Sequence, residues 1–239
     1  MQLVFLKLLI RKEGVIYHGG LLRFFHGFRV KETLQAKYHF PVAAHNDGKA
    51  AALAELATGH LKGVTNGAAL VLGSGLGGGI IINGKLFQGS HFQAGELTFL
   101  LPLQMEKLDP SLMQGTTLSA IGLITKVNEI LARLDLKDGL LAFKAINAKK
   151  EAVYPIFETY CRNLAITILN LQTIFDMETF VLGGGISAQS ILIEEVNRQF
   201  DKVHHEIDFI GKIIKRPKIV ACHHNGTNLI GAAYFLKQG

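Results

Sequence analysis

Short apolar runs alternate with longer segments of helical periodicity along most of the chain. Strands are expected at residues 14–17, 68–72, 80–82, 179–182 and 218–222, where apolar runs lie between glycine-rich or polar breaks. Helices are expected at residues 30–39, 47 to about 59, 118–134, 154–175, 187 to about 203, and 228–237. Strands and helices that alternate in this order predict an α/β fold built on a mixed sheet.

A glycine-dense segment at residues 73–79, Gly-Ser-Gly-Leu-Gly-Gly-Gly, lies between two of these apolar runs. The Asn83-Gly84 pair after the second run is typical of a type I′ hairpin turn, so the segment predicts a strand, a glycine loop, a second strand, a tight turn and a third strand. Its letters match G-x-G-x-x-G, but a dinucleotide site requires a helix after the loop, and here a strand comes next. Backbone N–H groups in such a loop can approach a phosphate, and a glycine-rich hairpin without a ligand fits the local sequence equally well.

Two junctions lead from a strand into a helix. At residues 45–47, His-Asn-Asp comes directly before an alanine-rich helix. A carboxylate at such a place is often a catalytic base and is also often a plain N-cap; the local residues favour Asp47 as the cap. At residues 183–185, three glycines connect a strand to a helix that Ser187 is expected to cap. A ligand can lie against such a backbone, although a tight strand-to-helix turn is the slightly favoured interpretation.

The composition excludes several classes of protein. The net charge is +6, but the basic residues are scattered and no helix-turn-helix or zinc-finger pattern occurs, so no nucleic-acid partner is expected. Two cysteines are too few for a disulfide framework or a cysteine-rich zinc cluster. No apolar run reaches the roughly 18 residues that a membrane span needs, and no signal-peptide cleavage site comes after the apolar start. A cytoplasmic protein without a membrane partner is expected, with the charged segment 137–151 on its surface.

Four motifs together identify a family resemblance. Residues 45–47 and the helix after them are similar to E-N-D-A-N-A-A-A, and residues 73–84 are similar to a second phosphate loop with its hairpin. Residues 94–96 read Ala-Gly-Glu, and residues 182–187 read Leu-Gly-Gly-Gly-Ile-Ser. In this order and spacing, from about residue 14 to the C-terminus, the chain resembles the ROK family (repressors, open reading frames, kinases) of sugar kinases in the actin-like ATPase superfamily.

The resemblance implies an actin-like ATPase (ribonuclease H-like) α/β fold with two lobes, and ATP- and Mg-dependent phosphorylation of a hexose or hexosamine. Asp47 would accept the proton of the attacking sugar hydroxyl, while Asn46, Gly95 and Glu96 would bind the sugar. The residues expected to bind the nucleotide are Gly73, Ser74, Gly75 and Gly77 at the phosphates and Gly183, Gly184 and Gly185 at the adenosine.

The sequence departs from the family pattern at three places. The D-x-G-x-T phosphate loop is absent, so residues 1–66 are expected to be the remnant of an N-terminal lobe and residues 67–239 the C-terminal lobe, with the last helix packing back on the first. Thr98-Phe99 stand where the family has Gly-His, and no cysteine-rich loop comes after them, so no zinc is expected. His45 stands where the family has an acidic residue. A histidine at such a position more often packs against its neighbours than takes part in catalysis.

These departures lead to further expectations. Residues 1–13 fit poorly with the rest of the chain and are expected to be an aberrant beginning, which would expose strand edges and favour a homo-oligomer. The main hypothesis is a sugar kinase, or a truncated remnant of one, acting on a small-molecule sugar. The alternative is a non-catalytic sugar-binding or regulatory protein without a DNA-binding domain, and a third possibility is a degraded product without activity.

Overall fold

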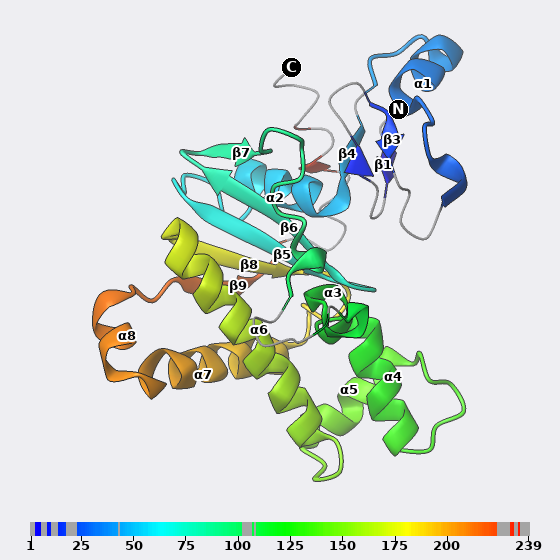
Figure 1. Cartoon of the computed structure of the whole chain (residues 1–239). Helices are drawn as coiled ribbons and strands as arrows, with labels where there is room; N and C mark the ends of the chain where they lie inside the picture. The colour runs from blue at the N-terminus through cyan, green and yellow to red at the C-terminus, as the bar shows by residue number, and fades with distance from the viewer. Residues whose placement is uncertain are drawn as a thin grey trace.

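A five-stranded mixed sheet forms the centre of the protein (Figure 1). The computed structural model describes residues 3–5, 9–10, 14–17, 23–42, 44–101, 107, 109–223, 230–231 and 234. The strands are β1 (Leu3–Phe5), β2 (Leu9–Ile10), β3 (Ile16–Tyr17), β4 (Ala44–Asn46), β5 (Gly67–Leu72), β6 (Leu76–Ile82), β7 (Lys85–Phe87), β8 (Thr179–Gly183) and β9 (Lys218–Ala221). The central sheet has the order β7-β6-β5-β8-β9, in which β5 pairs antiparallel with β6 and parallel with β8, so the predicted mixed sheet is confirmed.

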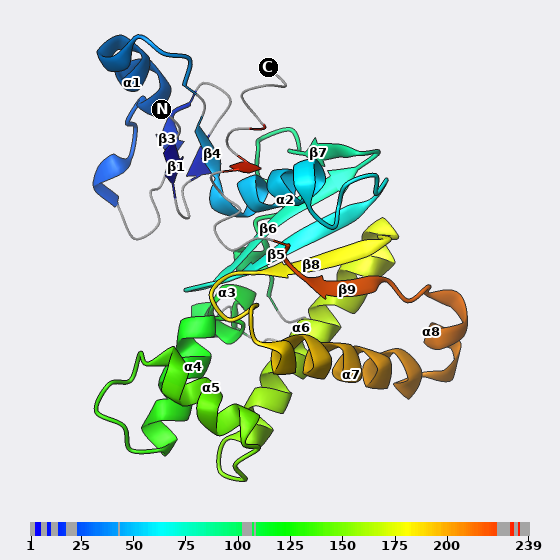
Figure 2. The ribbon, with the colours of Figure 1, turned by 180° about the vertical axis from the view of Figure 1, so that it is seen from behind.

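Helices cover both faces of this sheet, with α2 on one face and α6 and α7 on the other (Figures 1 and 2). The helices are α1 (Val30–Tyr38), α2 (Asp47–Thr58), α3 (Gln114–Thr117), α4 (Ala120–Ile130), α5 (Gly139–Asn147), α6 (Tyr154–Phe175), α7 (Ser190–Glu206) and α8 (Asp208–Ile213), with short 3₁₀ helices η1 (Arg23–Phe25), η2 (Leu97–Phe99) and η3 (Pro110–Leu112).

Strands β5 and β8 are buried on both faces because alternate side chains serve two different cores. Leu70 and Phe180 point into the large core shared with α4 to α7, whereas Ala69 and Val181 belong to a smaller core. That smaller core includes Ala52 of α2. This double burial explains why both strands read as continuous apolar runs in the sequence.

The N-terminal residues form two small pairs of strands. β1 pairs parallel with β4, and β2 pairs antiparallel with β3, so parts of the segment expected to be aberrant form strands. At the other end of the chain, Gly231 lies against helix α2, since a Cβ on it would come within 1.7 Å of the Ala50 carbonyl oxygen. The helix expected at 228–237 otherwise falls largely outside the described residues, and the division into lobes at residue 66 stays a prediction.

One prediction about the helical layer is right except at its ends, and one is wrong. The helix expected at 118–134 is α4, which begins two residues later, where the Ser119 side chain caps it by accepting from the Gly122 N–H (3.0 Å), and ends four residues earlier, at Ile130. The segment 137–151, expected on the surface, contains α5, whose Phe143 and Ile146 are buried in the large core. The segment was expected on the surface because charged residues flank the short apolar stretch 139–147, which has helical spacing.

The glycine segments also differ from their predictions. The loop expected at 73–79 is a turn of residues 73–75, because β6 already begins at Leu76. Ser187 does not cap α7; its hydroxyl donates to the Gly184 carbonyl oxygen (2.8 Å), and the helix begins at Ser190. The turn predicted at Asn83-Gly84 is confirmed, with φ of 52° and 69°.

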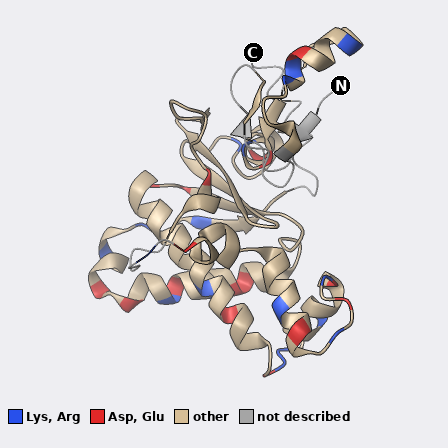
Figure 3. Ribbon diagram, turned by 45° about the vertical axis from the view of Figure 1, so that its right-hand side comes forward, with Lys and Arg blue, Asp and Glu red and all other residues tan. Residues whose placement is uncertain are grey.

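Charged residues of both signs interleave along the helices (Figure 3), as the scattered basic residues in the sequence predict. Cys161 and Cys222 are free thiols, of which Cys161 is buried and Cys222 is partly exposed. Within the described part of the chain, no helix is long and apolar enough to cross a bilayer.

Candidate functional site

The site begins where β4 delivers three polar residues to the first turn of α2. Asn46 is the N-cap, and its side-chain oxygen accepts from the N–H groups of Gly48 (2.9 Å) and Lys49 (3.2 Å). The cap predicted for Asp47 is therefore wrong by one residue, because Asn46 has the extended backbone of an N-cap and Asp47 is already helical. Asp47 is 6% exposed and its carboxylate accepts from the Gly48 N–H (2.8 Å). The positive end of the helix stabilises this buried carboxylate.

Glycines allow α2 to approach β6 very closely. A Cβ on Gly48 would lie 2.5 Å from the Gly78 nitrogen, and a Cβ on Gly79 would lie 3.0 Å from the Lys49 Cα. On the other side of the strand, a Cβ on Gly78 would lie 2.6 Å from the carbonyl oxygen of Gly95. The backbones of α2, β6 and the segment ending at Gly95 are therefore in contact. Glycine is required at positions 78 and 79 for this packing, a role that the interpretation of residues 73–79 as a loop did not include.

This stacking brings Glu96 to the first turn of α2. The Lys49 ammonium lies 3.5 Å from the Glu96 carboxylate, and it also donates to the carbonyl oxygen of Phe92. Lys49 is 2% exposed. The residues predicted to bind sugar, Asn46, Gly95 and Glu96, thus lie on adjoining segments with the predicted base Asp47. A lysine that the sequence analysis did not single out joins these segments. The sequence gives little signal for this lysine, because it lies inside an alanine-rich helix, at the position of the second asparagine of E-N-D-A-N-A-A-A.

Burial and neighbouring charges shift the pKa values of these groups. Burial raises the pKa of Glu96, the nearby Asp47 raises it further, and Lys49 opposes both effects. Burial lowers the pKa of Lys49, and Glu96 opposes that change. Burial, assisted by the Lys49 charge, lowers the pKa of His45 to about 4. The His45 Nδ1 accepts the Asn46 N–H (3.1 Å), which is the arrangement of a neutral imidazole.

His45 should make the stability of the protein sensitive to acid. Its folded pKa of about 4 lies below its ordinary 6.5, so the unfolded chain binds more protons in that window and stability falls as the pH drops from 6.5 toward 4. Between pH 7 and pH 5 the loss through His45 is expected to be about 2 kcal/mol. Urea unfolding of the wild type and His45→Asn at both pH values measures it. The exposed His91→Asn should keep the wild-type slope, and an equal slope in His45→Asn would refute the assignment.

The two glycine loops lie side by side at the carboxyl ends of neighbouring parallel strands. Val71 of β5 is paired with Gly183 of β8, and a Cβ on Gly184, whose φ is +99°, would lie 2.1 Å from the Leu72 carbonyl oxygen. By contrast, a Cβ on Gly73 or on Gly185 would meet no atom within 4 Å. The backbone is therefore open at one glycine of each loop, which fits a phosphate-bearing ligand that contacts both.

The glycine loops and the first turn of α2 share one side of the sheet. Gly77 comes after the 73–75 turn on β6, and a Cβ on it would lie 3.7 Å from the Cα of Gly48, next to Asp47. Gly77 itself is a strand residue paired with Val71, so its expected contact with nucleotide stays a prediction. Strand β6 thus connects the candidate phosphate-binding turn with the candidate base.

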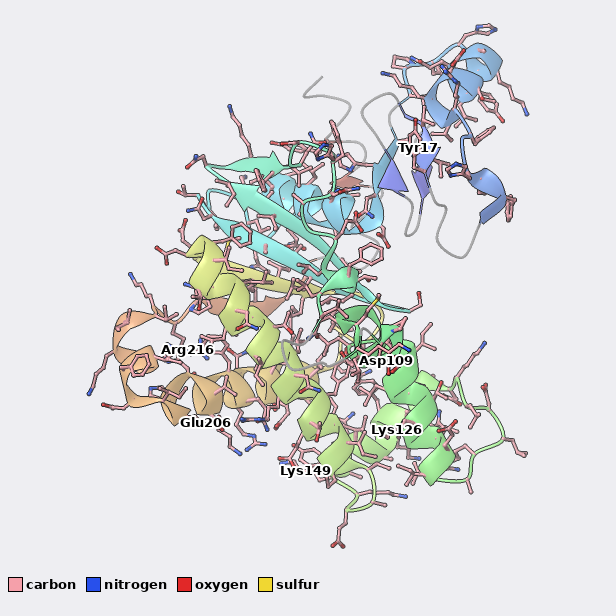
Figure 4. All side chains as sticks on the ribbon, viewed as in Figure 1. Tyr17, Asp109, Lys126, Lys149, Glu206 and Arg216 are labelled. Atoms are coloured by element: carbon pink, nitrogen blue, oxygen red, sulfur yellow. The ribbon has the colours of Figure 1, made fainter. Side chains whose placement is uncertain are left out.

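Two pockets lie away from this arrangement. One, of about 480 Å³, lies between α4 and α6 and includes Lys126, and the other, of about 600 Å³, lies beside α7 and includes Lys149 (Figure 4). Neither is lined by a residue that the sequence analysis assigned to a site. In the described residues, no three His, Cys, Asp or Glu side chains are grouped in a way that could hold a metal ion.

Known proteins provide an independent comparison. A family model described as ROK family matches residues 8–239. A β-glucoside kinase of Listeria monocytogenes is 30% identical over 233 residues, covering 95% of this chain and 75% of that protein. An N-acetyl-D-glucosamine kinase of Vibrio cholerae is 30% identical over 227 residues, covering 88% of this chain and 71% of that protein.

Solved structures agree with this result. A ROK family protein from Streptococcus pneumoniae in complex with sucrose is 29% identical, with a TM-score of 0.81 over 97% of this chain and 77% of that chain. A ROK family glucokinase from Streptomyces griseus in complex with glucose and AMPPNP has the same TM-score at 22% identity and shows the fold alone. The predicted actin-like ATPase fold is therefore confirmed. Since the family model spans nearly all of the chain, the protein belongs to the ROK family.

Proposed function

We propose that this protein is an ATP-dependent sugar kinase in which Asp47 is the general base for a hydroxyl of a hexose or hexosamine. The observation that carries the proposal is the stacking of α2, β6 and the segment before Glu96, which puts the sugar-motif residues beside Asp47. The names of the relatives, a β-glucoside kinase and an N-acetyl-D-glucosamine kinase, support the same reaction class.

The charges of the site favour a neutral polyol as substrate. Asp47 and Glu96 contribute two negative charges and Lys49 one positive charge, while His45 is neutral near pH 7 because its pKa is about 4. An anionic sugar would therefore be repelled at its reacting end. Glu96 and Asn46 would accept or donate hydrogen bonds to the ring hydroxyls, and buried polar groups of this kind discriminate against analogues that lack a hydroxyl.

Asp47 would accept the proton as the sugar oxygen attacks the γ-phosphorus and ADP leaves. The open backbone at Gly73, Ser74 and Gly75 would lie against the phosphates, and Gly183, Gly184 and Gly185 would lie against the adenosine. Mg²⁺, bound with ATP, supplies neutralisation of the phosphate charge. Catalysis by this chain's own groups is then positioning and proton removal, as in other phosphoryl transfers.

The proposal also covers the location, the partners and the assembly of the protein. Use of ATP implies activity in the cytoplasm, and no nucleic-acid or membrane partner is proposed. Assembly as a homo-oligomer is supported by exposed apolar side chains on α4 and α5, among them Ile130 (45% exposed) and Leu140 (82% exposed).

The test is ADP release by the purified protein with Mg-ATP and a panel of glucose, mannose, fructose, N-acetylmannosamine, N-acetylglucosamine and a β-glucoside. Calorimetric titration with the same sugars, in the absence of nucleotide, accompanies it. Sugar-dependent ADP release is the expected result. Sugar binding without ADP release would instead support the non-catalytic sugar-binding protein, and the absence of both from folded protein would refute the proposed function.

A further inference from the structure

A buried lysine lies in the middle of the candidate sugar site. Lys49 is on the first turn of α2, two residues after Asp47, and its side chain is 3% exposed. Its ammonium has two partners on the segment that precedes η2, the Glu96 carboxylate at 3.5 Å and the Phe92 carbonyl oxygen. The residue therefore connects the helix that holds Asp47 to the segment that holds Glu96.

Stability alone does not account for this arrangement. Removing both charges from water is unfavourable, and the attraction within a buried ion pair often only compensates for that loss. Because the approach of α2 to β6 is already fixed by backbone contact at Gly48 and Gly78, the lysine is not needed to hold the helix in place. What the lysine does determine is the position and charge of Glu96.

We propose that Lys49 is a positioning residue of the sugar site, whose ammonium joins Glu96 to the Phe92 carbonyl and holds the Glu96 carboxylate as an acceptor for a sugar hydroxyl beside Asp47. This inference rests on the proposed function, and it assigns to Lys49 a role that an asparagine in the same place could not perform. An asparagine is neutral and too short to reach both partners.

The protonation state of Glu96 is the property that depends on Lys49. The titratable groups that act on this pair among the described residues are His45 from β4 and Asp47 from α2. His45 is neutral, so it provides no positive charge, and Asp47 repels a second carboxylate. Burial and Asp47 both raise the pKa of Glu96, and Lys49 opposes them. Without the ammonium, Glu96 should become protonated nearer neutral pH and lose its role as an acceptor.

The first test is independent of sugar and of turnover. Protein labelled with ¹³C at the glutamate carboxyl carbons is titrated by NMR, with Glu96→Gln to assign the signal. In Lys49→Met the midpoint of the Glu96 titration should rise by at least about 1 pH unit. The matched control is Lys62→Met, an exposed lysine beyond the end of the same helix, and it should leave the midpoint unchanged. Lys49→Gln replaces Lys49→Met if circular dichroism shows that the latter is unfolded. An unchanged midpoint in a folded variant would overturn the proposal.

The second test measures sugar affinity by calorimetry at pH 6 and pH 8. The wild type and Lys62→Met should bind with nearly equal affinity at both pH values. Lys49→Met should bind more weakly at pH 6 than at pH 8, because the higher Glu96 pKa leaves a larger fraction of that carboxyl protonated at the lower pH. If the sugar affinity of Lys49→Met does not depend on pH, Lys49 has no role in sugar binding, even if the midpoint of the Glu96 titration shifts. If the wild type binds no sugar, the proposed function fails, whereas the carboxyl titration still decides the role of Lys49.

Discussion

Asp47→Asn is expected to reduce kcat for sugar phosphorylation by about a thousandfold and to change sugar affinity by no more than a few fold. Asparagine has the same shape and retains an oxygen that can accept the Gly48 N–H, which Asp47 accepts at 2.8 Å, so the start of α2 should persist. The amide cannot take a proton from the sugar hydroxyl, so only the chemical step is affected. Steady-state ADP release gives kcat, and calorimetry gives the sugar affinity.

The control for this variant is Asp208→Asn, which removes an exposed carboxylate at the start of α8, paired with Lys212 at 2.5 Å. Its kcat should equal that of the wild type. Turnover retained in Asp47→Asn would mean that another group removes the proton. Loss of sugar binding together with turnover would instead make Asp47 a binding residue and leave the base unidentified.

The sequence predicts those helices, strands and turns whose own residues carry a clear periodicity or a restricted backbone conformation. Helix α6 was predicted over its full length, because its apolar residues repeat at helical spacing along one uninterrupted face. Strands β5 and β8 were predicted because both faces are buried and the side chains read as apolar runs. The Asn83-Gly84 turn was predicted because positive φ at both central positions restricts the residue types.

The predictions that failed depend on contacts between segments far apart in the chain. Phe143 is buried by the T-shaped contact with Phe157 of α6 (6.2 Å between ring centroids), which the charges around α5 conceal in the sequence. Gly78 and Gly79 lie in a strand because α2 packs against them, and a local pattern of glycines indicates only a loop. In both cases the tertiary partner overrode the local signal.

The candidate site was only partly predictable for the same reason. The residues themselves suggested an N-cap for Asp47, and the family resemblance suggested a base. The pairing of Lys49 with Glu96 across 47 positions of sequence was accessible to neither, because it depends on how closely α2 approaches β6. A lysine inside an alanine-rich helix is ordinarily interpreted as part of a solvated face.

Gly184→Ala is expected to destabilise the protein by about 4 kcal/mol and to abolish nucleotide binding. Gly184 has a φ of +99°, which an L side chain rarely adopts, and its Cβ would lie 2.1 Å from the Leu72 carbonyl oxygen. Because both the strain and the collision involve backbone, β5 and β8 must separate at their carboxyl ends, where the two glycine loops meet. Thermal unfolding should show a midpoint lowered by roughly 10 °C.

Gly185→Ala is the matched variant, since its Cβ would meet no protein atom within 4 Å and its φ is not positive. It should unfold within about 0.5 kcal/mol of the wild type. Calorimetric titration with a non-hydrolysable ATP analogue should nevertheless show affinity reduced by about tenfold, because the added methyl group occupies the space proposed for the adenosine. Wild-type nucleotide affinity in Gly185→Ala would place the nucleotide elsewhere. A stable Gly184→Ala would show that the two loops are not in the backbone contact on which the nucleotide site depends.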